Sequence, residues 1–374
     1  MTAPTPPLAL FVAETRTGRV VMNDLPLSAV PRAGWRINAE GPLSFTVPMS
    51  ASFNRKQIAD FIYPWRYSFG VRCGSFVLQY GPLSEHPEYD PEGEDWSFDC
   101  GGMWKLFNTR RALLVDRNYV GLSRRDQFIR FLTDDMAQTN GDLPIDLPAL
   151  NGVAGAGALY PGSKYSWVGE LLRDQTDDGD DGLEAEFRPY FPDTTAMDFV
   201  RHRVDLAQFL GRQDRRHQWI SNSGLVMAAP VGGGSRIADV YIVPGTSSGT
   251  VTLKGQQQAA GGDILANQGW PLLHDVDGSH SSVSSQVQLQ GYANGNWVAY
   301  HRGSRIVRAR VRMNPPDGSG PKLGSWSLGD VGDFQVMGYL GVPDGVYTCR
   351  IIGADLATLE DIDLELMLIA EVPL

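Results

Sequence analysis

Two histidines, two aspartates and a cluster of serines lie within residues 274–285, which read HDVDGSHSSVSS. Imidazole nitrogens and carboxylate oxygens are the usual zinc ligands, so His274, Asp275, Asp277 and His280 could in principle hold a metal ion. Zinc ligands on one helix face are three or four residues apart, however, and those on a strand are two apart, whereas His274 and His280 are six apart. A serine nucleophile needs a histidine and an acid that meet it in space, which sequence proximity does not show. The segment therefore predicts no catalytic residue, no metal site and no cofactor site.

A helix start explains the same residues better. Ser281 or Ser282 could accept a hydrogen bond from a backbone N–H of the first helical turn. The apolar residues that follow recur mostly at steps of three or four, at Val283, Val287, Leu289, Tyr292, Ala293, Trp297 and Tyr300. We therefore expect a loop that leads into a capped helix.

Two acidic segments are weaker candidates for chemistry. Residues 174–184, DQTDDGDDGLE, have the acidic density of a calcium loop, but an alignment that starts at Asp177 places Arg188 where a bidentate glutamate is needed. We interpret this segment as a solvated turn. Asp134 and Asp135 are expected to be an exposed carboxylate pair without the cleft that a glycosidase requires.

Arginines form two basic clusters. Residues 211–217, GRQDRRH, contain Arg212, Arg215, Arg216 and His217, which we interpret as a salt-bridged surface. In the segment RIVRARVRM, strand alternation places Arg308, Arg310 and Arg312 on one face. Arginine is favoured in contacts with carboxylates of neighbouring subunits, so we predict an assembly interface at these three residues.

The length, composition and net charge of the chain exclude several classes of function. The chain has 374 residues, 42% apolar and 20% charged, with a net charge of −11, which is enough for ordinary globular cores in two to three domains. A DNA-coating role would need an excess of Lys and Arg, whereas an acidic protein suits a conduit through which DNA passes without sticking. The three cysteines show no C-x-x-C spacing, and no apolar run reaches transmembrane length. We therefore expect no disulfide framework, no secretion leader and no membrane span.

The pattern of elements predicts a β-rich chain with a few helices. Strands are expected at residues 8–12, 18–22, 34–39, 43–48, 69–73, 75–82 and 96–100, a spacing typical of a barrel or small sandwich. Helices are expected within 101–113, within 121–138 with a capping box of Ser123 and Asp126, and within 163–174. Residues 183–191 and 197–206 should pair across a turn at Pro192 and Asp193.

Taken in order, several segments resemble one protein family. They are LSFTVP, WSFDCGGMWKLFNTR, YSWVGELLRD, GLEAEFRPYF, DFVRHRV, PKLGSWSLGDVGDFQV, PDGVYTCRIIG and, most specifically, GWPLLHDVDGSHSSVSSQVQLQGYA. They are similar to the tail-tip hub, also called minor tail protein or tail-associated protein, of long-tailed bacteriophages that infect actinobacteria. The resemblance covers nearly the whole chain, although its motifs are short and carry no chemistry.

The resemblance implies a mainly β fold with α+β insertions, in which two barrel-like tube domains are joined by accessory domains. Residues 1–110 would form the N-terminal tube barrel and residues 111–220 an accessory α+β domain. Residues 221–304 would be connecting strands and a long helix, partly accessory. Residues 305–374 would form the C-terminal tube barrel, completed by strands from 221–260. Three copies would then present six similar barrels around a channel, which lets a trimer match a six-fold tail ring.

The function implied by the resemblance is structural and non-enzymatic. The hub of such a siphovirus would close the tail tube, join the distal tail ring to the central fibre and form a channel for genome ejection. Its expected partners are two further copies in a homotrimer, the distal tail protein ring, the tape measure protein, the central fibre or other minor tail proteins, and phage DNA in transit. It would be located at the tail tip of the virion after assembly in the host cytoplasm, without stable membrane association. The alternatives are a hexameric distal tail ring protein and a protein that binds or hydrolyses cell-wall carbohydrate.

Overall fold

The computed structural model describes residues 7–25, 27, 29–48, 58–90, 95–112, 116–155, 157, 159–176, 183–233, 237–248, 251–261, 264–281, 283–300, 304–315, 320–339, 342 and 344–373. Contacts divide the chain into two compact units. The larger unit comprises Met1–Thr176, Leu183–Ala228 and Arg308–Leu374, and the smaller comprises Asp177–Gly182 and Ala229–Val307.

The larger unit begins with an antiparallel sheet in the order β2-β1-β5-β6. Its strands are β1 (Leu8–Glu14), β2 (Val20–Leu25), β5 (Tyr67–Cys73) and β6 (Phe76–Pro82). β1 and β5 are nearly continuous runs of buried residues, because both strands are central and are covered on both faces. The strands predicted at these positions are confirmed.

A second, longer sheet contains strands from both ends of the chain. Its order is β15-β19-β22-β21-β3-β4-β8-β7, and β20 pairs with both β21 and β14. The strands are β3 (Arg32–Arg36), β4 (Leu43–Pro48), β7 (Glu88–Asp90), β8 (Asp95–Asp99), β14 (His217–Ile220), β15 (Leu225–Gly233), β19 (Ser304–Arg312), β20 (Val331–Val336), β21 (Gly345–Leu356) and β22 (Asp361–Pro373).

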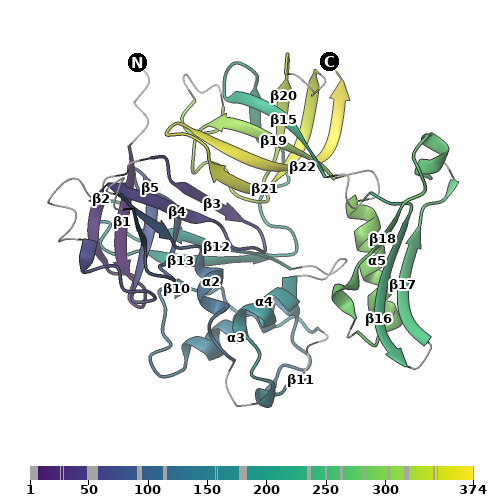
Figure 1. Ribbon diagram of the computed structural model, residues 1–374, viewed down its shortest axis with the longest axis horizontal. Helices are drawn as coiled ribbons and strands as arrows, with labels where there is room; N and C mark the ends of the chain where they lie inside the picture. The colour runs from purple at the N-terminus through teal and green to yellow at the C-terminus, as the bar shows by residue number, and fades with distance from the viewer. Residues whose placement is uncertain are drawn as a thin grey trace. The chain divides into compact units, whose positions relative to one another are not determined.

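The pairing of β3 with β21 joins the two ends of the chain into this one sheet (Figure 1). The strands are antiparallel, and Trp35 lies opposite Ala354. The side chain of Trp35 packs against Trp326 with ring centroids 6.0 Å apart. Strands separated by more than 300 residues therefore pair through their backbones, and the loop before β20 adds a side-chain contact to β3.

An aromatic core lies between the first sheet and the N-terminal strands of the second. Phe45 of β4 stacks on Phe98 of β8 at 4.9 Å between ring centroids, and Phe69 of β5 lies 5.4 Å from Phe45. All three rings are buried. Alternation places Leu43, Phe45 and Val47 on this inner face, as the strand pattern predicted.

The middle of the chain adds helices and a small sheet to the same unit. The helices are α2 (Met103–Phe107), α3 (Arg124–Met136) and α4 (Val168–Thr176), with a 3-10 turn η1 (Gly162–Lys164). The strands are β9 (Arg117–Asn118), β10 (Ile145–Asp146), β11 (Leu159–Tyr160), β12 (Glu184–Tyr190) and β13 (Arg201–Ala207). Phe107, Phe128 and Phe187 bring α2, α3 and β12 together in one buried core. The predicted pairing of residues 183–191 with 197–206 is confirmed, with Phe187 opposite Val204.

Only half of the predicted capping box forms at α3. The hydroxyl of Ser123 accepts a hydrogen bond from the backbone N–H of Asp126 at 3.2 Å, as expected for an N-cap. The carboxylate of Asp126 does not return to Ser123. It accepts hydrogen bonds from the backbone N–H groups of Asn151 and Gly152 at 3.0 and 2.9 Å, so it fastens a distant loop to the start of the helix.

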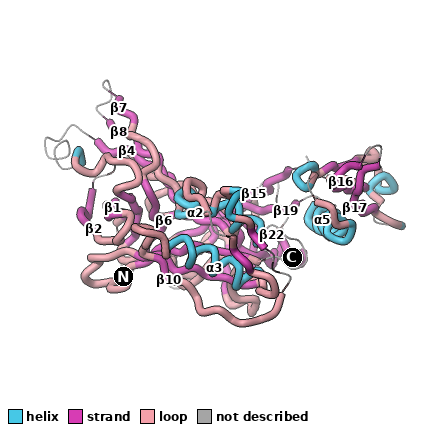
Figure 2. Tube along the Cα trace, turned by 90° about the horizontal axis from the view of Figure 1, so that it is seen from below, coloured by secondary structure: helices cyan, strands magenta, loops and turns pink. Residues whose placement is uncertain are grey.

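The smaller unit is a three-stranded sheet in the order β17-β16-β18 with helix α5 on one face (Figure 2). Its elements are β16 (Val240–Ser248), β17 (Val251–Gln258), η4 (Leu265–Gln268), β18 (His274–Val276), η5 (Gly278–His280) and α5 (Gln286–Tyr300). Leu289 and Ala293 of the helix are fully buried against Val243. A Cβ atom at Gly255 would lie 1.8 Å from the carbonyl oxygen of Leu289, so the helix backbone rests directly on β17.

The predicted fold class, mainly β with α+β insertions, is confirmed. The barrel-like domains appear in the described residues as open sheets, because the hydrogen-bonded order of each sheet ends at two unpaired edges. The bounds of the four predicted domains and the similarity between the two ends of the chain stay predictions. No helix among the described residues is long and apolar enough to cross a membrane.

Candidate functional site

The histidine and aspartate cluster lies in the smaller unit and has structural contacts. The ring of His280 stacks on Tyr292 of α5 with centroids 3.7 Å apart, and its Nε2 is 3.9 Å from Asp277 Oδ2. Asp277 accepts hydrogen bonds from the N–H of Ser279 at 3.1 Å and from Nδ2 of Asn296 at 3.1 Å. His274 is exposed in β18. Within the described ranges, no three His, Cys, Asp or Glu side chains gather closely enough to hold a metal ion.

The prediction that Ser281 caps the helix is wrong, and Ser282 lies outside the described residues. Ser281 ends the 3-10 turn η5, while the helix begins at Gln286. Ser285 is closer to a capping position, since its hydroxyl is 3.4 Å from the N–H of Gln288. The helix starts late because the carbonyl of Val283 accepts a hydrogen bond from Thr246 of β16, which holds the preceding residues against the sheet.

Residues 245–249, GTSSG, have the G-x-S-x-G spacing of a hydrolase nucleophile elbow. An elbow places its serine on a sharp turn between a strand and a helix. Ser247 instead lies within β16, and its hydroxyl is 2.9 Å from that of Thr252 on the partner strand β17. The position is therefore that of a hairpin residue, although Gly249 lies outside the described residues.

The alternation predicted for β19 is confirmed in its described side chains. Ala309 and Val311 are buried at 1% exposure, whereas Arg308 and Arg312 are exposed and Arg310 is half-buried. The three arginines therefore share the outer face of the long sheet.

Two of these arginines already have carboxylate partners within the chain. Arg310 donates two hydrogen bonds to Asp363 of β22, from Nε at 2.7 Å and from Nη2 at 2.8 Å. This pair raises the pKa of Arg310, mainly through the hydrogen bonds. Nη1 of Arg312 lies 3.7 Å from Glu360. Arg308 makes no ion pair with the residues that the structure describes, so it is the cation of this face most available to a neighbour.

The row of charges continues across the sheet to β3. Arg36 forms an ion pair with Asp355 of β21, and its Nε lies 3.4 Å from Glu365 of β22. Asp355 is opposite Asp363 in the register, so two carboxylates lie between Arg310 and Arg36. Gly34 allows this arrangement because a Cβ there would lie 2.0 Å from Asp355 Oδ1. Across β19, β22, β21 and β3, a row of two neighbouring carboxylates is therefore flanked by one arginine on each side.

The sequence contains a pattern that predicts the acidic partners of these arginines, and our prediction did not use it. Residues 361–366, DIDLEL, place a carboxylate at every second position, which is the same alternation as in RARVR. Complementary charges on neighbouring strands stabilise a sheet, but the sequence did not show that β19 and β22 are neighbours.

The second basic cluster is mostly neutralised, as interpreted. Arg215 contacts Asp333 at 2.7 Å, Arg216 pairs with Asp214, and Nε2 of His217 is 3.2 Å from Asp330. Arg212 behaves differently, because it is one of the residues that line a pocket next to β12 and β13. Sequence reasoning did not single out this pocket.

The acidic candidates also have structural contacts. Asp135 is buried at 3% exposure, which contradicts the expectation of an exposed pair, and it contacts Nε of Arg110 at 2.9 Å. Burial raises the pKa of Asp135 to about 6 against the opposing effect of Arg110. Asp134 accepts a hydrogen bond from the Tyr119 hydroxyl at 2.6 Å. Residues 177–182 of the predicted acidic turn lie outside the described residues.

No protein-family model matches the chain, and no curated protein matches it. A tail protein from Neisseria meningitidis MC58 has a similar structure, with a TM-score of 0.56, 12% identity and 96% of each chain covered. The 43 kDa tail protein of prophage MuSo2 from Shewanella oneidensis has a TM-score of 0.52 and 10% identity, and covers 96% of this chain and 98% of its own.

A third similar structure is a Francisella PdpA–VgrG complex, with a TM-score of 0.52, 8% identity and coverage of 96% of this chain and 57% of the other. At these identities the likeness concerns the fold. The chain therefore has the fold of phage tail proteins over nearly its whole length.

Proposed function

We propose that this chain is the structural hub of a phage tail tip, which closes the tail tube as a homotrimer and joins the distal tail ring to the central fibre. The observation that carries the proposal is the tail-protein fold over 96% of the chain. The pairing of β3 with β21 supports it, because a single sheet built from both ends lets each subunit contribute one continuous wall. Three such walls could surround a channel, in keeping with closed cyclic symmetry.

The charged outer face of the long sheet suits a surface along which DNA passes. A DNA-binding surface needs unneutralised Lys and Arg side chains to contact phosphates. Here Arg310 is neutralised by Asp363, and Arg36 by Asp355 and Glu365. The proposal assigns the neutralised part of this face, from Arg310 to Arg36, to the wall of the channel, through which phage DNA would move without being retained.

The copy number tests the hub assignment. Native mass spectrometry of the full chain should give a species of three times 41.0 kDa. A hexamer would instead favour the distal tail ring protein, and a stable monomer at micromolar concentration would contradict both roles.

Arg308 and Arg312 are the residues of this face that we propose for the subunit interface. R308Q/R312Q should weaken the trimer in moderate salt while the monomer stays folded, because both side chains are exposed and remain charged donors for a neighbouring carboxylate. R16Q is the matched control, since Arg16 is another exposed arginine, 55% accessible and paired with Asp142. An unchanged trimer midpoint for R308Q/R312Q across a salt titration would place the interface elsewhere.

A further inference from the structure

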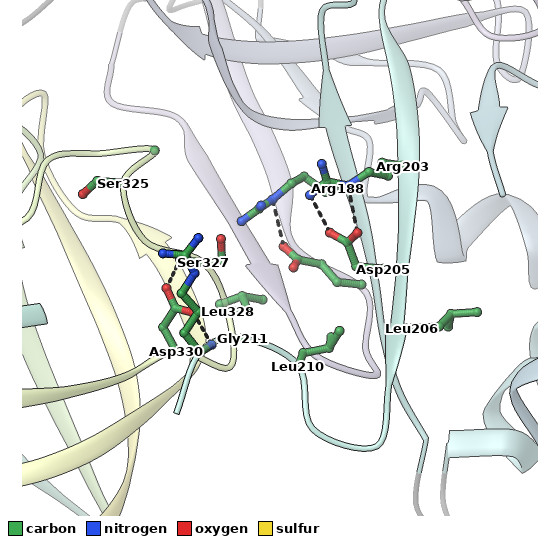
Figure 3. Close-up of a pocket in the computed structure, with 13 residues that line it drawn as sticks. Arg188, Arg203, Asp205, Leu206, Leu210, Gly211, Ser325, Ser327, Leu328 and Asp330 are labelled. Atoms are coloured by element: carbon green, nitrogen blue, oxygen red, sulfur yellow. Dashed lines mark hydrogen bonds and ion pairs between the residues drawn. The ribbon is translucent and has the colours of Figure 1, made fainter. Parts of the chain in front are cut away.

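A polar pocket of about 450 Å³ lies in the larger unit beside the small sheet (Figure 3). One wall is formed by Glu186 and Arg188 of β12 with Arg203 and Asp205 of β13. The other walls come from residues 210–212 and from residues 324–330, which precede β20. The volume is within the range of small-molecule sites, but the lining is dominated by charged groups.

Two of the carboxylates in this pocket are fully engaged. Asp205 accepts two hydrogen bonds from Arg203, at 2.8 and 2.9 Å. Asp330 accepts hydrogen bonds from the N–H of Arg212 at 2.6 Å and from the N–H of Ser327 at 2.9 Å. Arg203 therefore neutralises Asp205, whereas Asp330 keeps its negative charge and is held in place by its hydrogen bonds and by His217.

Two guanidinium groups remain available. The side chain of Arg212 makes no ion pair in the part of the chain that the structure describes. Arg188 has Glu186 at 3.8 Å as its described carboxylate contact, a separation too long for a hydrogen bond. Figure 3 shows Arg188 extending from β12 into the pocket, on the side of the loop that carries Ser327. Arginine donors with free N–H groups are suited to bidentate contacts with oxyanions.

Glu186 is the remaining acid, and it is buried at 4% exposure. Burial raises its pKa to about 7, against the effect of Arg188, while Asp205 and Asp330 act in the same direction as burial and Arg203 opposes it. Below that pH the carboxyl is protonated and can donate a hydrogen bond, whereas above it the carboxylate repels an anion.

We infer that this pocket binds a small oxyanion, held by the guanidinium groups of Arg188 and Arg212 with the hydroxyl of Ser327 as an additional donor. The group bound is a tetrahedral anion of the phosphate or sulfate type, or a carboxylate. This inference concerns the larger unit by itself and does not depend on the proposed function.

Isothermal titration of the full chain with sulfate and, separately, with acetate tests the inference. Both probes keep a constant charge between about pH 6 and pH 8, so a change in affinity reports on the protein. Saturable binding of either probe at one site per chain supports the proposal. Tighter binding of sulfate would indicate a tetrahedral anion as the ligand, and tighter binding of acetate would indicate a carboxylate. Absence of saturable binding of both at millimolar concentration overturns it.

Variants locate the binding to the pocket. R188Q and R212Q should each weaken binding about 10-fold or more, the effect of losing one charge-assisted contact. R215Q is the matched control, because Arg215 lies three residues from Arg212 but pairs with Asp333 and does not line the pocket. Equal losses in R215Q and R212Q would mean an adventitious ion only, bound by general electrostatics. In the unaltered chain, anion binding should weaken from about pH 6 to pH 8, because Glu186 becomes negatively charged. E186Q should still bind the anion and should not show this pH dependence. Thermal melts of every variant report whether it is folded.

Discussion

Arg350 is the side chain whose loss should destabilise the larger unit most clearly. It lies in β21 and contacts Glu184 of β12, with Nη1 to Oε1 at 2.6 Å and Nη2 to Oε2. It also donates to the carbonyls of Gly329 at 3.2 Å and Leu210 at 3.1 Å. Glu184 in turn accepts from the N–H of Leu210 at 2.7 Å. The pair thus joins the long sheet, the small sheet and two loops.

The expected magnitude follows from burial. The side chains of Arg350 and Glu184 are 6% and 16% exposed, so solvent screens the pair weakly. R350M removes four hydrogen bonds and leaves Glu184 as an uncompensated buried charge, which typically costs about 3–5 kcal/mol. At roughly 2 °C per kcal/mol for a large domain, the melting temperature of this unit should fall by about 6–10 °C.

Urea unfolding followed by tryptophan fluorescence measures this loss in a double-mutant cycle. The double variant R350M/E184Q should recover part of the stability, because a neutral glutamine leaves no buried charge, so the coupling energy should exceed about 1.5 kcal/mol. R16M is the control, since the exposed pair of Arg16 and Asp142 should contribute only about 0–1 kcal/mol. A loss below about 1 kcal/mol in R350M, or additive single and double losses, would refute the reasoning.

For two other perturbations, a change of pH and a substitution at Gly255, the structure determines whether stability should rise or fall. Burial lowers the pKa of His202 from 6.5 to about 4. Between these two pH values the unfolded state binds more protons than the folded state. The free energy of unfolding should therefore fall by about 3 kcal/mol as the pH drops from 6.5 to 4. H202F should flatten that part of the unfolding profile, and an unchanged slope would exclude His202 as its cause. G255A should loosen α5 and reduce its protection from hydrogen exchange by about 1–3 kcal/mol, because the new methyl group meets Leu289. In the control G291A, where the added Cβ meets nothing within 4 Å, protection should rise, and equal effects in both variants would contradict the packing argument.

Local patterns in the sequence determined the elements of this protein. Alternation of apolar residues in LSFTVP fixes which side chains are buried, because a strand has a period of two. In LEAEFRPYF the same alternation holds except at Glu186, which lies on the polar face but is buried. The spacing of Phe128 and Leu132, with Ser123 as the cap, likewise determined α3. The pairing of β12 with β13 was predictable, since the two strands follow each other in the sequence and only residues 191–200 connect them. These features depend on residues that are close in sequence.

Tertiary structure decided which distant elements meet, and with them the chemistry of the candidate sites. Whether Arg310 is a free cation depends on β22 lying beside β19, which places Asp363 within 2.7 Å. Ser281 lost its capping role because Thr246 of a different strand holds Val283 in place. The pocket of Arg188 and Arg212 exists only because residues 324–330 fold next to β12 and β13. Such contacts depend on how whole sheets pack. Local alternation shows which face of a strand each side chain is on, but it does not show which strands lie next to each other.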